Sequence, residues 1–142
     1  MTVISSNPIE EKNSVYRGKL LVSLLAYGVI GWFVAAWICR TLGPMGVYDG
    51  SAQIILYGAI IVGTVPFVWV LRPLLGVRRS EMFAAAAIVD MAALVCDGVA
   101  VAWFPSLYGT DPQMVVDSAA AVLYGAGVLL AVGFFLTGPD TA

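Results

Sequence analysis

Four long apolar segments dominate this sequence and leave few ways for it to fold. They are separated by short stretches rich in Gly, Pro and charged residues, and they cover residues 20–39, 52–71, 82–104 and 114–136. An α-helix rises 1.5 Å per residue, so about 20 residues span the roughly 30 Å hydrocarbon core of a bilayer. Each segment therefore predicts one transmembrane helix.

The composition agrees with a membrane location. Of the 142 residues, 61% are hydrophobic and only 11% are charged. A soluble domain of this length has too small an interior to bury so many apolar side chains. We therefore predict an all-α integral membrane protein, an up-and-down bundle of four helices in which short loops join antiparallel neighbours. The chain has no basic face for nucleic acid, and the lipid bilayer is its expected partner.

The basic residues predict how the helices are oriented. Six of the seven Lys and Arg residues lie before the first segment or around the loop between the second and third; they are Lys12, Arg17, Lys19, Arg72, Arg78 and Arg79. Arg40 lies alone at the opposite end of the predicted helices. The positive-inside rule then places both termini in the cytoplasm, with residues 1–19 as an N-terminal tail and residues 137–142 as a C-terminal tail.

Two aspartates lie inside the third segment, where a charge is costly. Asp90 and Asp97 interrupt its apolar run, and a carboxylate costs about 2.5–3.5 kcal/mol at a bilayer centre on insertion scales. They are seven residues apart, so two helical turns place them on one face, about 10 Å apart along the axis. Since no Lys or Arg lies inside a predicted crossing, a buried carboxyl there is expected to hold a proton or to await a cation.

Other polar side chains are predicted at similar depths. Counted from the cytoplasmic ends, Asp90 lies about 12 Å and Asp97 about 22 Å into the membrane. The candidate residues for binding a substrate or a proton share a polar group near these levels; they are Asp97, Asp90, Tyr57, Thr64, Tyr27 and Tyr124. In the alternative interpretation, neutral aspartic acids hydrogen-bond Tyr, Thr or backbone carbonyls and hold the helices together.

Histidine is absent from the sequence, and its absence disfavours several functions. A haem ligand, a typical catalytic zinc site and a histidine general base all ordinarily draw on this side chain. Cys39 and Cys96 lie in different segments without a CxxC motif, so we interpret them as small apolar side chains. No nucleotide-binding or hydrolase motif occurs. We therefore predict no cofactor, no metal and no catalytic residue, and an enzyme is the less favoured class.

Aromatic residues gather toward the ends of the apolar segments. They are Trp32, Trp37, Trp69, Trp103, Tyr48, Phe104 and Tyr108. Trp and Tyr are enriched where a membrane meets water, because their rings are apolar and their N–H or O–H groups are polar. We interpret these residues as interfacial belts.

The stretch 97–109, DGVAVAWFPSLYG, combines an acid, an apolar run and a Phe-Pro turn into the last helix. It resembles a family of small four-helix bacterial inner-membrane proteins that is known only as a domain of unknown function. The resemblance covers the last two crossings and implies four crossings in a bacterial inner (plasma) membrane. Asp97 and the turn at Phe104 and Pro105 match its recurring pattern, whereas Asp90 lies outside it. Four-helix multidrug exporters resemble the chain less, because their key acid lies in the first crossing.

These observations favour a membrane-embedded binder or carrier that responds to protons or cations. In this hypothesis Asp97, helped by Asp90, exchanges a proton or meets the cationic or polar group of a small amphipathic substrate. A carrier with only four helices is expected to act as a homodimer. The alternatives are a non-catalytic accessory subunit of a larger membrane complex and, third, a membrane-embedded isomerase or cyclase with an acidic proton donor.

Overall fold

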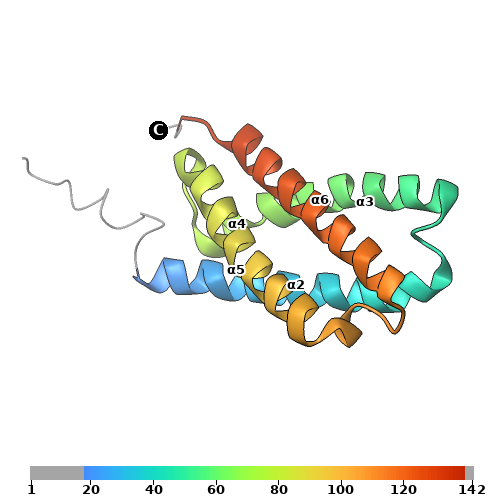
Figure 1. Ribbon diagram of the computed structural model, residues 1–142. Coiled ribbons are helices and arrows are strands. Elements are labelled where there is room, and N and C mark those ends of the chain that lie inside the picture. Colours follow the sequence, from blue (N-terminus) through green and yellow to red (C-terminus); the bar gives the residue numbers. More distant parts are fainter. Residues whose placement is uncertain (1–17, 140–142) are drawn as a thin grey trace, which may run out of the picture.

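Four long helices make up most of the protein in a computed structural model that describes residues 18–139. They are α2 (Gly18–Leu42), α3 (Gly50–Trp69), α5 (Met82–Trp103) and α6 (Pro112–Leu136) (Figure 1). Each belongs to a span long and apolar enough to cross a membrane, and the described residues contain no strand. The all-helical class and the four apolar helices are thus confirmed. Most of the predicted tails, positions 1–17 and 140–142, lies outside the described residues, whereas Gly18 and Lys19, predicted to belong to the N-terminal tail, are part of α2.

The helix ends differ from the predicted segments in ways that local chemistry explains. The fourth helix begins at Pro112, where a proline is tolerated because the first-turn N–H has no helical partner. Asp111 caps it, accepting a 2.7 Å hydrogen bond from the backbone N–H of Gln113. The second apolar segment is divided, since α3 ends at Trp69 and a separate turn, α4 (Leu71–Leu75), follows. Gly76 follows the last residue of α4 as its C-cap, and its φ of 68° suits glycine.

The helices alternate in direction along the chain, but their closest neighbours are not all consecutive. In Figure 1, α2 and α5 run one way and α3 and α6 run the other. The main contacts join α2 to α5, α5 to α6 and α6 to α3. Gly28 helps α2 approach α5, since a Cβ there would lie only 2.9 Å from the Cβ of Ala92. Antiparallel packing therefore holds for α5 and α6, whereas α2 packs parallel to α5 and only sparsely against α3.

The buried side chains form a cluster toward each end of the bundle. The larger cluster consists of Leu24, Val68, Leu71, Val77, Met82, Ala85, Ala86 and Val89. The smaller one consists of Ala36, Ala100 and Tyr108. Helix α5 contributes to both clusters, because it lies between α2 and α6. The part of α5 between the two clusters carries both aspartates.

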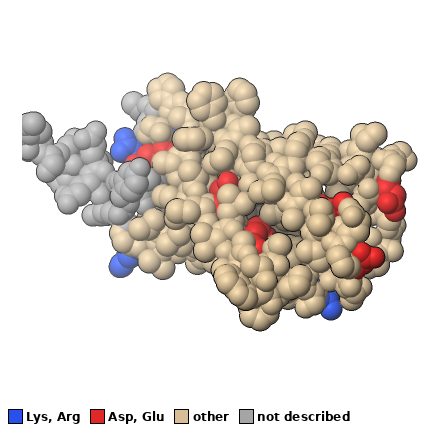
Figure 2. Space-filling model, in the orientation of Figure 1, with Lys and Arg blue, Asp and Glu red and all other residues tan. Residues whose placement is uncertain are grey.

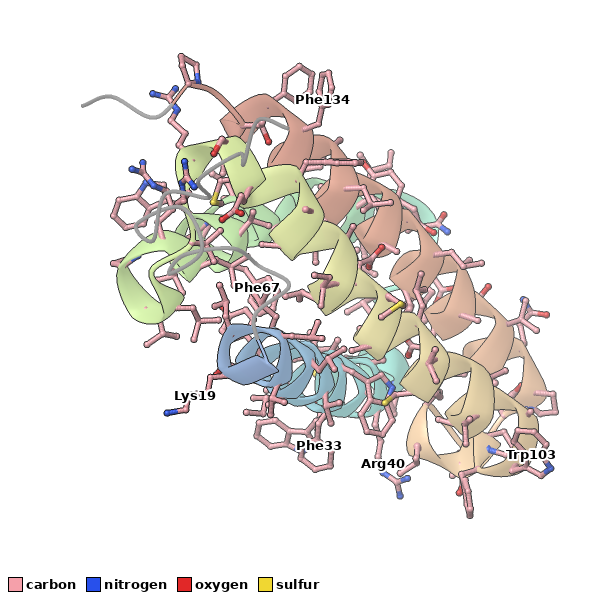
Figure 3. All side chains as sticks on the ribbon, turned by 90° about the vertical axis from the view of Figure 1, so that its left-hand side faces the viewer. Lys19, Phe33, Arg40, Phe67, Trp103 and Phe134 are labelled. Atoms are coloured by element: carbon pink, nitrogen blue, oxygen red, sulfur yellow. The ribbon has the colours of Figure 1, made fainter. Side chains whose placement is uncertain are left out.

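The outer surface is apolar along the length of the helices. Trp37 is 63% and Phe135 80% exposed, and Phe33, Trp103 and Phe134 point away from the bundle in Figure 3. On the face shown in Figure 2, the basic side chains of the described residues lie toward the two ends of the long axis. Such a surface suits hydrocarbon, because exposed apolar patches of this extent are rare on soluble monomers.

Candidate functional site

A cavity of about 520 Å³ lies between the four long helices. Its walls come from α2, α3, α5 and α6, with Val47 and Tyr48 from the loop after α2. Most lining side chains are aliphatic or small, and the two acids among them are Asp90 and Asp97. Among residues 18–139, no Lys or Arg contributes to the lining. The cavity is therefore an apolar space with negative or neutral acidic groups on one wall.

Asp97 is the end of a hydrogen-bonded chain that also contains Tyr108 and Trp32. The hydroxyl of Tyr108 donates to Asp97 Oδ1, and Trp32 Nε1 donates to the Tyr108 hydroxyl oxygen at 3.0 Å. Tyr108 is fully buried and follows the short turn η3 (Pro105–Leu107), which folds back after α5. Burial, followed by the hydrogen bond to Asp97, raises the pKa of Tyr108, so its hydroxyl stays protonated and remains a donor.

Asp90 lies two turns earlier on α5 without such support. Asp90 is only 5% exposed and lines the cavity. Within residues 18–139, its carboxyl has neither a hydrogen-bond nor an ion-pair partner. A buried, unpartnered acid is costly, so this position suits a proton or an incoming cation.

Thr64 also lines the cavity, but its hydroxyl is already used. It donates to the carbonyl oxygen of Ile60 on its own helix at 2.6 Å. Such a bond to the preceding turn is a common way for a threonine to satisfy its hydroxyl in an apolar helix. The side chain can still accept a hydrogen bond from a ligand, but its donor is occupied.

The three tyrosines predicted for the site do not line the cavity. Tyr27 stacks on the ring of Phe67, with centroids 4.6 Å apart, and donates its hydroxyl to the Phe67 carbonyl at 3.0 Å. Tyr57 and Tyr124 pack ring against ring between α3 and α6, also at 4.6 Å. The structure thus gathers Asp90, Asp97 and Thr64 at the cavity, whereas these tyrosines serve helix contacts.

Three aromatic residues assigned to the interface turn inward instead. Tyr108 is fully buried, and Trp32 and Tyr48 are partly buried and line the cavity, so the belt interpretation is wrong for them. It agrees with Trp69 and Trp103, which are 56% and 70% exposed. Trp32 and Tyr108 are 76 positions apart, and no sequence spacing links them. The nearest sequence signal is the turn after α5, which returns a tyrosine toward Asp97.

A second polar group borders the cavity near the loop after α2. Tyr48 and Ser118 share a hydrogen bond of 2.9 Å between their hydroxyl oxygens. Tyr48 and Cys39 line the cavity, and Cys39 is a free, half-buried thiol. Within residues 18–139, no three His, Cys, Asp or Glu side chains lie close enough together to hold a metal ion. The site can therefore offer carboxyl and hydroxyl contacts to an organic ligand.

No protein-family model, curated protein or solved structure matches this chain. The resemblance of its last two helices to a small four-helix membrane family therefore stays a prediction. What can be inferred about function rests on the cavity and on the contrast between its two acids.

Proposed function

We propose that this chain is a multi-pass membrane protein whose cavity binds the cationic or polar group of a small amphipathic substrate. The observation that supports this most directly is Asp90, which is 5% exposed and faces an apolar cavity of about 520 Å³. Ionisable groups inside membrane helices usually pair with one another or mark a ligand or proton pathway. Asp90 has no such partner among the described residues, so a ligand is its natural counter-charge.

The same carboxyl can couple binding to protonation. A proton and a cation compete for one carboxylate, so substrate binding weakens in acid and protonation favours release. The other titratable groups that line the cavity are Asp97, Cys39 and Tyr48. Asp97 is already engaged by Tyr108, which makes Asp90 the acid more open to exchange. The protein would then act as a proton- or cation-responsive binder or carrier, and as a homodimer if it transports.

The charges support an orientation for this carrier. Lys19 lies at the start of α2 and Arg72 in α4, with Arg78 and Arg79 just before α5, whereas Arg40 lies in the last turn of α2, at the other end of the helices. By the positive-inside rule, the end with more basic residues faces the cytoplasm. We place both termini there, in a bacterial inner membrane, so that Tyr48 and Tyr108 lie near the outer side.

A binding experiment tests the role of Asp90. Octylammonium is titrated calorimetrically into the full chain in lipid nanodiscs, with empty nanodiscs as the blank. Asp90→Asn should weaken binding about a hundredfold, because losing one partner of a buried ion pair costs about 3 kcal/mol or more. The matched control is Asp117→Asn, which makes the same change outside the cavity, where Asp117 accepts a hydrogen bond from Gln113.

Three results would contradict the proposal as stated. Equal binding by wild type and Asp90→Asn would remove Asp90 from the site. Loss of binding in Asp97→Asn alone would assign the contact to Asp97, as the sequence analysis expected. No binding by the wild type, together with a stable protein that co-purifies, would favour the accessory-subunit alternative.

A further inference from the structure

The cavity has an opening on one side, between α2 and α3. Ala35 on α2 and Gly63 on α3 line the cavity and are also exposed. The same is true of Val34 and Ile38, which are 46% and 42% exposed. Because α2 and α3 make few close contacts, the space between them is continuous with the outside of the bundle.

The opening has defined ends. Toward the end that carries α4, Phe67 closes the gap between α2 and α3. Its ring packs directly against Gly31, where an added Cβ would lie only 2.7 Å from the tip of the ring. Figure 3 shows Phe67 beside α2, and Tyr27 stacks on it. Toward the other end, Val47 and Tyr48 form the cavity wall. The opening therefore faces sideways at the level of the apolar helices, where a bilayer places hydrocarbon.

The chemistry of the walls limits what can occupy this space. Within the part of the chain that the structure describes, the lining has no cationic side chain and carries Asp90 on its α5 wall, so charge complementarity favours a cation over an anion. The remaining walls are mostly aliphatic and suit an alkyl chain. A volume of 520 Å³ has room for roughly seventeen groups the size of a water molecule, each of about 30 Å³.

We infer that the ligand is a single-chain cationic amphiphile that reaches Asp90 from the hydrocarbon core of the membrane through the opening between α2 and α3. Its positively charged head meets the Asp90 carboxylate, and its alkyl chain lies between the two helices. The inference rests on the proposed function, since it assigns a substrate class and an access route to the same site. It adds that a short, water-soluble amine lacks the chain contacts and binds more weakly.

Two glycines on α3 provide a matched test of the route. A Cβ at Gly63 or at Gly58 would meet nothing within 4 Å, so both sites have room for a side chain. Both are exposed, but only Gly63 lines the cavity. Gly63→Leu therefore obstructs the opening, and Gly58→Leu makes the same change on the same helix outside the cavity lining.

Trp32 serves as the reporter because it lines the cavity. The other three tryptophans, Trp37, Trp69 and Trp103, are all more than half exposed and are replaced by Phe. The full chain in nanodiscs is then titrated with ω-bromoundecylammonium, whose bromine quenches Trp fluorescence on close approach. We expect saturable quenching, which Gly63→Leu weakens about tenfold through steric overfilling and Gly58→Leu leaves unchanged.

The outcomes separate the route from the function. If Asp90→Asn abolishes quenching but Gly63→Leu does not weaken it, the lateral route is wrong and the proposed function survives. If Asp90→Asn has no effect, the proposed function fails and the inference fails with it. If bromopropylammonium binds as tightly as the long amine, the alkyl-chain requirement is refuted. Efficient disulfide formation between two Gly63→Cys copies, without quenching, would show instead that a second copy covers the opening.

Discussion

Asp90 and Asp97 lie two turns apart on one helix and line one cavity, yet their surroundings differ. Asp97 accepts a hydrogen bond from Tyr108, which is itself supported by Trp32. Asp90 is equally buried but has no partner among residues 18–139. The difference teaches that burial alone does not make an acid available for binding. The acid must also lack a hydrogen-bond donor from a neighbouring segment.

The supply of donors differs between the two ends of the cavity. Beyond Asp97, the chain folds back through η3 and places the Tyr108 hydroxyl at the carboxyl. Near Asp90, the tyrosine predicted at the same depth is Tyr27, and its hydroxyl is spent on the Phe67 carbonyl. A tyrosine has one donor, so Tyr27 has none left for Asp90. Asp90 therefore lacks a partner because the Phe67 carbonyl accepts the hydrogen bond that Tyr27 could have donated to it.

The largest effect on stability is expected from Tyr108→Phe, which makes Asp97 resemble Asp90. The variant removes the donor to Asp97 and the acceptor of Trp32 Nε1. Leaving a buried polar group unsatisfied costs about 1–3 kcal/mol, so we expect a loss of about 3 kcal/mol. Thermal unfolding in detergent measures it. Unchanged stability would mean that the chain of hydrogen bonds does not hold α2 against α5.

A smaller effect, of opposite sign, is expected from Asp90→Leu. Replacing an unpartnered buried acid by an apolar side chain removes its desolvation cost, and such changes are often neutral or stabilising by about 1–2 kcal/mol. The unfolding temperature should rise or stay the same while octylammonium binding is lost. Marked destabilisation would show that Asp90 has a structural role, and the contrast between the two acids would disappear.

The smallest effect is expected from Thr64→Val. The threonine hydroxyl donates only to Ile60 on its own helix, and its removal frees a carbonyl that already belongs to the helical ladder. The free energy of unfolding should change by less than about 0.5 kcal/mol, and binding should change little. A large loss of affinity in the same calorimetric titration would add Thr64 to the ligand contacts and extend the site from α5 to α3.

Much of the fold followed from local features of the sequence. The length and composition of the apolar segments predicted four helices, because hydropathy and helical rise depend only on neighbouring residues. The spacing of Asp90 and Asp97 predicted a shared face in the same way. The depth of Tyr27 could be counted along its helix. The direction of its side chain around the helix axis could not, and that direction decided that its hydroxyl donates to the Phe67 carbonyl.

The sequence by itself determined the four apolar helices, their alternating course and the presence of two acids on one face of the third. Only the tertiary structure decided which acid was satisfied. Trp32, Asp97 and Tyr108 come from three separate segments, and their meeting depends on the close approach of α2 to α5 at Gly28. That packing also leaves α2 apart from α3, because a helix that presses closely on one neighbour presents less surface to another.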